Sequence, residues 1–119
     1  MPDWRILALW KFESSPLFGD AEPAALQLAR ASAVVPNAVR PEHFEELRRH
    51  FSDRQISELL AVIALGGFLN RYRDTLAVVT DSESADWACQ FLTPAGWRPG
   101  KHTGSAEERR PAFPRLEER

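Results

Sequence analysis

Apolar residues recur every three or four positions along most of residues 1–92, and the alternating pattern of a half-buried strand is nearly absent. This spacing predicts an all-α chain built as a helical bundle. Four main helices are expected: one ending near Phe12, one over residues 21–34, one beginning at Pro41 and a long one over 53–78. A short fifth helix should end near Leu92.

Polar residues and prolines mark where these helices begin. The carboxylate of Asp20 is placed to accept from the free backbone N–H groups of the second helix, as an N-cap does. Pro41 stands at the first position of the third helix, where its missing N–H costs least. Ser52 and Gln55 form a capping-box pattern at the start of the long helix, and Asp81 gives a similar signal before the short one.

The long helix expected over 53–78 is apolar around more than half of its circumference. Its apolar positions are Ile56, Leu59, Leu60, Ile63, Leu65, Phe68, Leu69, Tyr72 and Leu76. A surface helix needs only one apolar stripe, so burial on several sides is expected. Gly66 and Gly67 in its interior each cost about 1 kcal/mol relative to alanine, which favours a second backbone packed closely there. We therefore expect other subunits to complete the core, making the protein a homo-oligomer.

The composition changes at Thr93. Proline and glycine recur from there to Pro114, which predicts a helical domain over 1–92 followed by an extended Pro/Gly-rich tail over 93–119. Trp97 should need a surface to lie on.

The charge and the cysteine content limit the classes of binding partner and the cell compartment that we expect. Fifteen basic and seventeen acidic residues are interleaved, giving a formal charge of −2. No field is present to hold a nucleic acid or an anionic membrane. The apolar run from Leu59 to Leu69 is too short to cross a bilayer. One cysteine, Cys89, excludes a disulfide within the chain and fits a reducing cytosol, and no signal-peptide pattern follows Met1, so a cytoplasmic protein is expected.

Several segments carry a resemblance to a known family. They are Leu9–Phe18, the alanine-rich stretch Ala24–Ala33, His50–Leu60, Asn70–Leu76 and Gly96–Gly104. The third and fourth resemble the long C-terminal helix of alkylhydroperoxidase D-like proteins, of the carboxymuconolactone decarboxylase family, and its closing Asn-Arg-x-x-Asp pattern. The other segments are similar to the same family, and to the C-terminal extension of some bacterial members.

The resemblance implies a helical fold that assembles into dimers, trimers or hexamers. In the family's peroxidase branch, the chemistry belongs to a C-x-x-C pair with a preceding Glu and a following His, in a helical region before the segment seen here. Such a dithiol attacks a hydroperoxide and resolves the sulfenic acid as a disulfide. The decarboxylase branch draws its acid–base residues from the same region. These residues have no counterpart in this chain, so we expect no catalytic residue, no cofactor and no peroxidase activity of its own, as in a truncated, split or naturally reduced member.

Two other groups of residues are candidates for chemistry. Cys89 has no adjacent base and no resolving partner, and we interpret it as a small buried hydrophobe. His43, Glu46 and His50 share one helical face, but a metal site would need another ligand and a protected setting. The flanking Glu45, Arg48 and Arg49 indicate a solvated face instead, so we expect no metal.

Asn70, Arg71 and Asp74 form the sharpest polar cluster, on a helix that is otherwise mostly apolar. Buried polar groups must find hydrogen bonds, so the cluster is interpreted as a structural tie to a loop or to a neighbouring subunit. Alternatively it lines a substrate pocket. Three functions stay open: a family member without the dithiol, a helical interaction module pairing with a separate C-x-x-C-bearing protein, and a small-molecule binder near Asn70 and Arg71.

Overall fold

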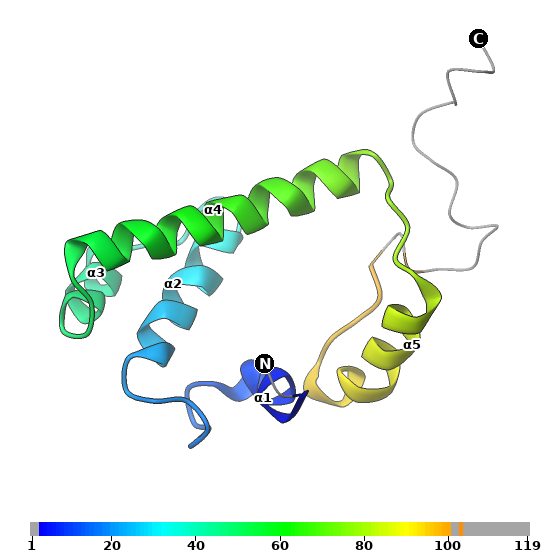
Figure 1. Ribbon diagram of the computed structural model, residues 1–119, viewed down its shortest axis with the longest axis horizontal. Coiled ribbons are helices and arrows are strands. Elements are labelled where there is room, and N and C mark those ends of the chain that lie inside the picture. The colour runs from blue at the N-terminus through cyan, green and yellow to red at the C-terminus, as the bar shows by residue number, and fades with distance from the viewer. Residues whose placement is uncertain (1–2, 101–102, 104–119) are drawn as a thin grey trace, which may run out of the picture. The chain divides into compact units, whose positions relative to one another are not determined.

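The computed structural model describes residues 3–100 and residue 103, and these form helices and loops without a strand among them (Figure 1). The elements are α1 (Asp3–Ala8), η1 (Leu9–Lys11), α2 (Glu22–Ala33), α3 (Pro41–Arg48), α4 (Asp53–Thr75), α5 (Ser82–Phe91) and η2 (Thr93–Ala95), the η elements being 3₁₀ turns. The predicted all-α class is confirmed. None of the described helices is both long enough and apolar enough to cross a membrane.

The chain divides into two compact units, Met1–Phe68 and Leu69–Arg119, with the boundary inside α4. Each unit is described separately. The expected tail over 93–119 begins with a 3₁₀ turn rather than extended chain, because a proline is tolerated at the first turn of a helix. Most of the remaining tail lies outside the described residues, so the division into 1–92 and 93–119 stays a prediction.

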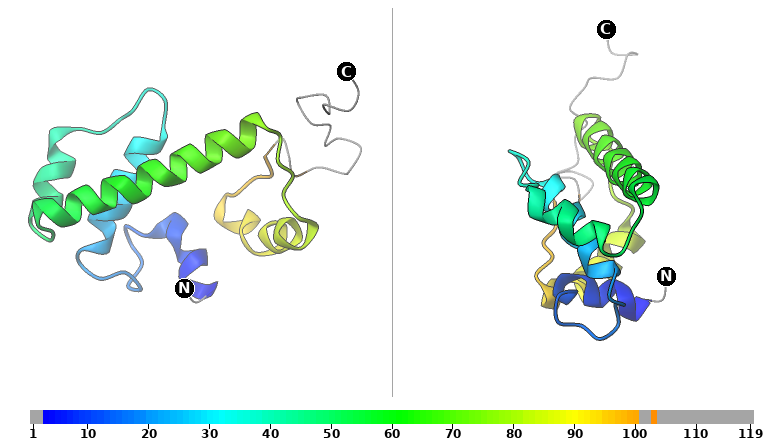
Figure 2. Two further views of the ribbon diagram at one scale, coloured as in Figure 1. Left: turned by 45° about the horizontal axis from the view of Figure 1, so that its top comes forward. Right: turned by 90° about the vertical axis from the view of Figure 1, so that its left-hand side faces the viewer.

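The core of the first unit forms where α2, α3 and the start of α4 meet. Its buried residues are Ala24, Leu28, Leu47 and Ile56, packed against the partly buried Val39, Phe44, Phe51, Leu59 and Ile63. Leu28 and Leu47 are both completely buried. Figure 2 shows α2 and α3 lying beside the N-terminal part of α4. The contact is made by one apolar stripe from each helix, the arrangement that amphipathic helices require.

Two arginines stacked on aromatic rings hold the N-terminal segment against α2. The Arg5 guanidinium lies 5.1 Å from the centre of the buried Phe18 ring and pairs with Glu22. Arg30 lies 5.0 Å from the centre of the Phe12 ring, which is also buried. A cation over an aromatic face is attracted by the ring's quadrupole, so each arginine both covers a buried ring and keeps its charge near solvent.

Three of the four predicted helix starts are confirmed. The Ser52 N–H donates to Gln55 Oε1 at 2.9 Å, and the Gln55 N–H donates to Ser52 Oγ at 3.3 Å, which completes the capping box of α4. The Asp81 carboxylate accepts from the Ser84 N–H at 2.8 Å at the start of α5. Pro41 opens α3.

The prediction that Asp20 caps the second helix is wrong. The N-cap position is Ala21, which offers no side-chain acceptor. Glu22, the first helical residue, instead reaches back and accepts the Gly19 N–H at 2.8 Å. That hydrogen bond, followed by the one from Arg5, holds the pKa of Glu22 below its ordinary value of 4.5.

The long helix ends at Thr75, earlier than the expected Val78. Ala77 adopts a left-handed backbone conformation with φ 54°, and the Val78 N–H donates to the Arg73 carbonyl at 2.9 Å. This is the 6→1 bond of a Schellman ending, which satisfies a carbonyl at the helix terminus. Sequence patterning missed it because this position normally holds glycine, which has no Cβ to strain.

The second unit buries three small or medium apolar residues, Ala77, Ala85 and Leu92. The Trp87 and Phe91 rings of α5 lie 5.4 Å apart, centre to centre. Trp97 is half-buried, as its need for a surface predicted. Its backbone N–H donates to the Leu92 carbonyl at 3.1 Å. This small core agrees with the shortness of the elements that build it.

The Glu22 carboxylate should make the stability of the first unit depend on pH. A group whose pKa is lowered by folding stabilises the folded state above its unfolded pKa, and that contribution is lost as the pH falls through the folded pKa. Glu22→Gln should therefore lower the urea midpoint at neutral pH and reduce its fall in acid. Glu45→Gln on the exposed side of α3 serves as the control. Equal pH dependence in wild type and Glu22→Gln would contradict the assignment.

Candidate functional site

The cluster expected to matter most, Asn70, Arg71 and Asp74, lies exposed on the last turns of α4. Asp74 follows Asn70 by four residues and Arg71 by three, so the side chains are neighbours on the helix surface. Whether they tie the chain to a neighbouring subunit or line a pocket stays a prediction.

Cys89 was expected to be buried and is exposed on α5. The helix turns Ala85 into the core of its unit and leaves the thiol on the solvent side. Periodicity alone did not separate these positions, because α5 spans fewer than three turns and its apolar residues lie on more than one side.

The residues His43, Glu46 and His50 do share one side of α3 and the turn after it, but their side chains are used locally. The Glu46 carboxylate accepts from Arg49 at 3.0 Å and lies 3.1 Å from His50 Nε2. His43 Nδ1 accepts the backbone N–H of Arg40 at 2.9 Å, which caps the start of α3. No group of three or more His, Cys, Asp or Glu among the described residues is arranged to hold a metal ion.

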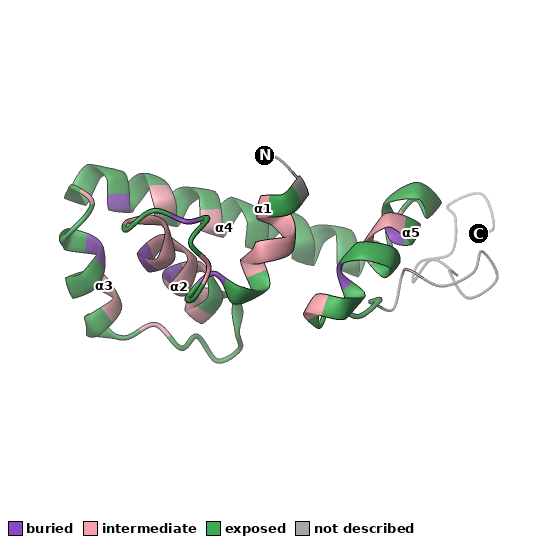
Figure 3. Ribbon diagram, turned by 90° about the horizontal axis from the view of Figure 1, so that it is seen from below, coloured by how far each residue is buried: buried purple, intermediate pink, exposed green. Residues whose placement is uncertain are grey.

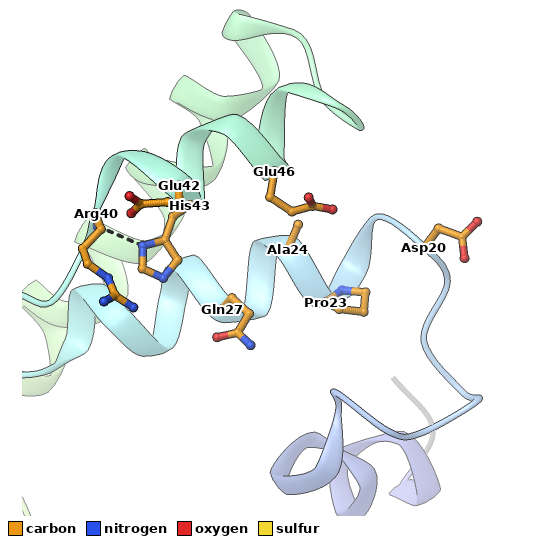
Figure 4. A pocket seen from close by; sticks show the side chains of 8 residues that line it. All are labelled: Asp20, Pro23, Ala24, Gln27, Arg40, Glu42, His43 and Glu46. Atoms are coloured by element: carbon orange, nitrogen blue, oxygen red, sulfur yellow. Dashed lines mark hydrogen bonds between the residues drawn. The ribbon is translucent and has the colours of Figure 1, made fainter.

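A cleft of about 410 Å³ lies between α2 and α3 (Figure 4). Its lining residues are Asp20, Pro23, Ala24, Gln27, Arg40, Glu42, His43 and Glu46. The volume lies within the range of small-molecule pockets. Three carboxylates against one guanidinium give the lining a negative balance. Of these lining residues, the sequence analysis named only His43 and Glu46 as candidates for chemistry. The residues of α2 could not be predicted to line the same cleft, because the packing of α2 against α3 brings them there.

The C-terminal half of α4 in the first unit presents a second feature, a group of exposed apolar residues. Val62 is 69% exposed, Leu65 58% and Phe68 61%. At 3.6 residues per turn, Leu65 and Phe68 point away from the core residues Ile56 and Ile63. We call Ala61, Val62, Leu65 and Phe68 the outer face of α4.

The long helix was expected to be buried on several sides with the help of other subunits, and the described residues of this chain bury one side of it. Among the apolar positions of α4, Ile56 is buried, and Leu59 and Ile63 are half-buried. The helix ribbon beyond this contact is coloured as exposed along most of its length (Figure 3). One side of α4 therefore completes the core of its unit, and another apolar side meets solvent.

The glycine pair in α4 is open as well. A Cβ built on Gly66 or on Gly67 meets no atom of the structure within 4 Å, leaving aside the helix's own nearby backbone. The second backbone expected at this point is therefore not supplied by the described part of the chain. The glycines leave room for the close approach of a helix from outside.

Comparison with known proteins adds a partial relative. No family model matches the chain, and no solved structure matches it. It is 32% identical over 74 residues to the uncharacterized protein YnjA of Escherichia coli strain K12. The matched region is 62% of this chain and 41% of that protein, so the chain spans less than half the length of the curated relative it matches. The relative's name states no activity.

The cap formed by His43 gives a testable consequence. His43→Ala removes the acceptor for the Arg40 N–H and should lower the free energy of unfolding by about 1 kcal/mol. His43→Asn retains a side-chain acceptor and should lose less. Urea unfolding followed by far-ultraviolet circular dichroism measures both. Equal losses in the two variants would show that the ring contributes by packing rather than by capping.

Proposed function

We propose that this chain is an alkylhydroperoxidase D-like protein of the carboxymuconolactone decarboxylase family that lacks the redox dithiol. Its function is association through helices, with other copies of itself, rather than peroxide chemistry. The observation that carries the proposal is the exposed outer face of α4. The resemblance of the segments His50–Leu60 and Asn70–Leu76 to the family supports the lineage.

The outer face has the composition of an interface core. Residues 59–70 of α4 contain no charged side chain, and the charged residues Glu58 and Arg71 stand directly on either side. Interface cores are depleted of charge and enriched in large apolar residues, as in Leu65 and Phe68. Contiguous apolar surface of this kind marks an interaction site, because burying it releases roughly 25 cal/mol for each Å² removed from water.

The proposed association also completes the helical bundle. The core of the first unit uses α2, α3 and one side of α4, so helices of another copy would supply the layer on the opposite side. A bundle of four main helices closed by other subunits is therefore the assembly we propose.

The absence of a dithiol supports a function other than peroxide reduction. Cys89 is the one cysteine of the 119 residues, and resolution of a sulfenic acid as a protein disulfide needs two thiols. A separate protein carrying Glu…C-x-x-C…His is the alternative partner for the same outer face. In that case the complex, and not this chain, would carry the chemistry.

A charge placed in the outer face should break the assembly. Leu65→Glu puts a carboxylate at a 58%-exposed apolar position that the proposed partner would desolvate. Light scattering at micromolar concentration should give more than one chain mass for the wild type and one chain mass for the variant. Leu17→Glu is the matched control, since this leucine is also exposed, at 41%, and lies outside α4. A wild type with the mass of one chain would refute self-association.

Assays with an organic hydroperoxide and excess dithiol reductant should detect no turnover by the purified chain. Cys89→Ala should behave as the wild type does. Turnover that disappears in Cys89→Ala would overturn the proposal, because it would make the exposed thiol a peroxidatic cysteine resolved by an external reductant.

A further inference from the structure

We propose that the cleft between α2 and α3 binds a small organic cation: a primary ammonium ion that carries a carbonyl group and an apolar side chain. The cleft lies wholly within the first unit, and the proposal does not depend on self-association. It is carried by three properties of the cleft: an apolar wall, a fixed hydrogen-bond donor beside an acceptor, and a negative charge balance.

The wall of the cleft on the α2 side is apolar. Ala24 is buried and Pro23 is half-buried, and both line the cleft (Figure 4). Ala24 also belongs to the core of the first unit, so packing fixes the position of this wall. Small-molecule pockets are lined mostly by apolar groups, with a few polar groups that orient the ligand.

His43 supplies a hydrogen-bond donor whose direction is fixed. Its Nδ1 accepts the backbone N–H of Arg40 at 2.9 Å. A neutral imidazole carries one proton, so when Nδ1 is the acceptor the proton is on Nε2. Figure 4 shows the ring between the two helices, with this second nitrogen on the side of α2. No group among the described residues accepts from Nε2, so its N–H is available to a carbonyl oxygen of a ligand.

Glu46 places an acceptor beside this donor. It follows His43 by three residues, so the two side chains are neighbours on the surface of α3. The Glu46 carboxylate already lies 3.0 Å from Arg49 Nη1 and 3.1 Å from His50 Nε2. A carboxylate has about four acceptor positions, so it can also accept from an ammonium group. A donor and an acceptor this close together fit a ligand whose ammonium group stands on the carbon next to its carbonyl.

The remaining charges of the cleft favour a cation over an anion. Asp20 and Glu42 also line it, against the guanidinium group of Arg40. Neither carboxylate is paired with a base among the described residues, and Asp20 does not cap α2, where the N-cap residue is Ala21. Together with Glu46, these carboxylates give the cleft a negative potential, which attracts a positively charged ligand and repels an anionic one.

Phenylalaninamide is the probe, because it carries an ammonium group, a carbonyl group and an apolar ring. Isothermal titration calorimetry with the full chain, at neutral pH and low ionic strength, should show one site per chain. Two matched compounds each lack one group: 3-phenylpropanamide has no ammonium group, and 2-phenylethylamine has no carbonyl. Each should bind about tenfold more weakly than phenylalaninamide. Equal affinity for the three compounds, or no binding at millimolar concentrations, would overturn the proposal.

Charge-removing variants test whether the compound binds in the cleft. Glu46→Gln and Asp20→Asn each remove one negative charge, and Glu46→Gln should raise the Kd of phenylalaninamide about tenfold. Asp20→Asn should raise it less, because this carboxylate acts through the potential of the cleft. Glu45→Gln, outside the cleft on α3, is the control and should leave the Kd unchanged. Circular dichroism verifies that each variant keeps its helix content. An unchanged Kd in Glu46→Gln would place the binding elsewhere and overturn the proposed site.

The role of the imidazole has its own test. His43→Asn retains a side-chain acceptor for the cap of α3 but lacks the ring N–H that faces the cleft. It should weaken the binding of phenylalaninamide and leave that of 2-phenylethylamine unchanged, because only the first compound has a carbonyl to accept from Nε2. Equal weakening of both compounds would overturn the assignment of the Nε2 N–H as the donor.

Discussion

The structure depends on one constraint: α4 carries apolar residues on two sides, and among the described residues one side is packed into the core while the other is exposed. Ile56, which is buried, and Ile63, which is half-buried, pack into the core that α2 and α3 form. Leu65 and Phe68 face solvent, at 58% and 61% exposure. A helix with two apolar sides is stable in water only when something lies against both. The proposed self-association follows from this imbalance.

In the first unit, α2 and α3 pack against one side of α4. The buried pair Leu28 and Leu47 joins α2 to α3 and gives α4 a surface to lie on. Arg5 and Arg30, stacked on the buried rings of Phe18 and Phe12, hold the N-terminal segment against α2. The cleft of about 410 Å³ lies between these same two helices, α2 and α3, and the buried Ala24 is among the residues that line it.

Chemistry and architecture point in different directions in this chain. In the family that the chain resembles, peroxide chemistry belongs to a dithiol, whereas this sequence has a single cysteine, which lies exposed on α5. The polar candidates on α3 are engaged in capping and in local ion pairs. The outer face of α4 is exposed and apolar, and an interaction surface accounts for such a face better than a reactive group does.

The sequence alone determined the helical class, the positions of the helices and most of their starts. These depend on contacts within a few residues, such as the reciprocal bonds of Ser52 and Gln55 or the bond from Ser84 to Asp81. The tertiary structure decided that Glu22 rather than Asp20 serves the start of α2, that Cys89 faces solvent and that α2 and α3 enclose a cleft. It also decided which apolar side of α4 meets its own chain. The pattern of a helix lists its apolar positions, but burial depends on which surfaces the rest of the fold brings against them.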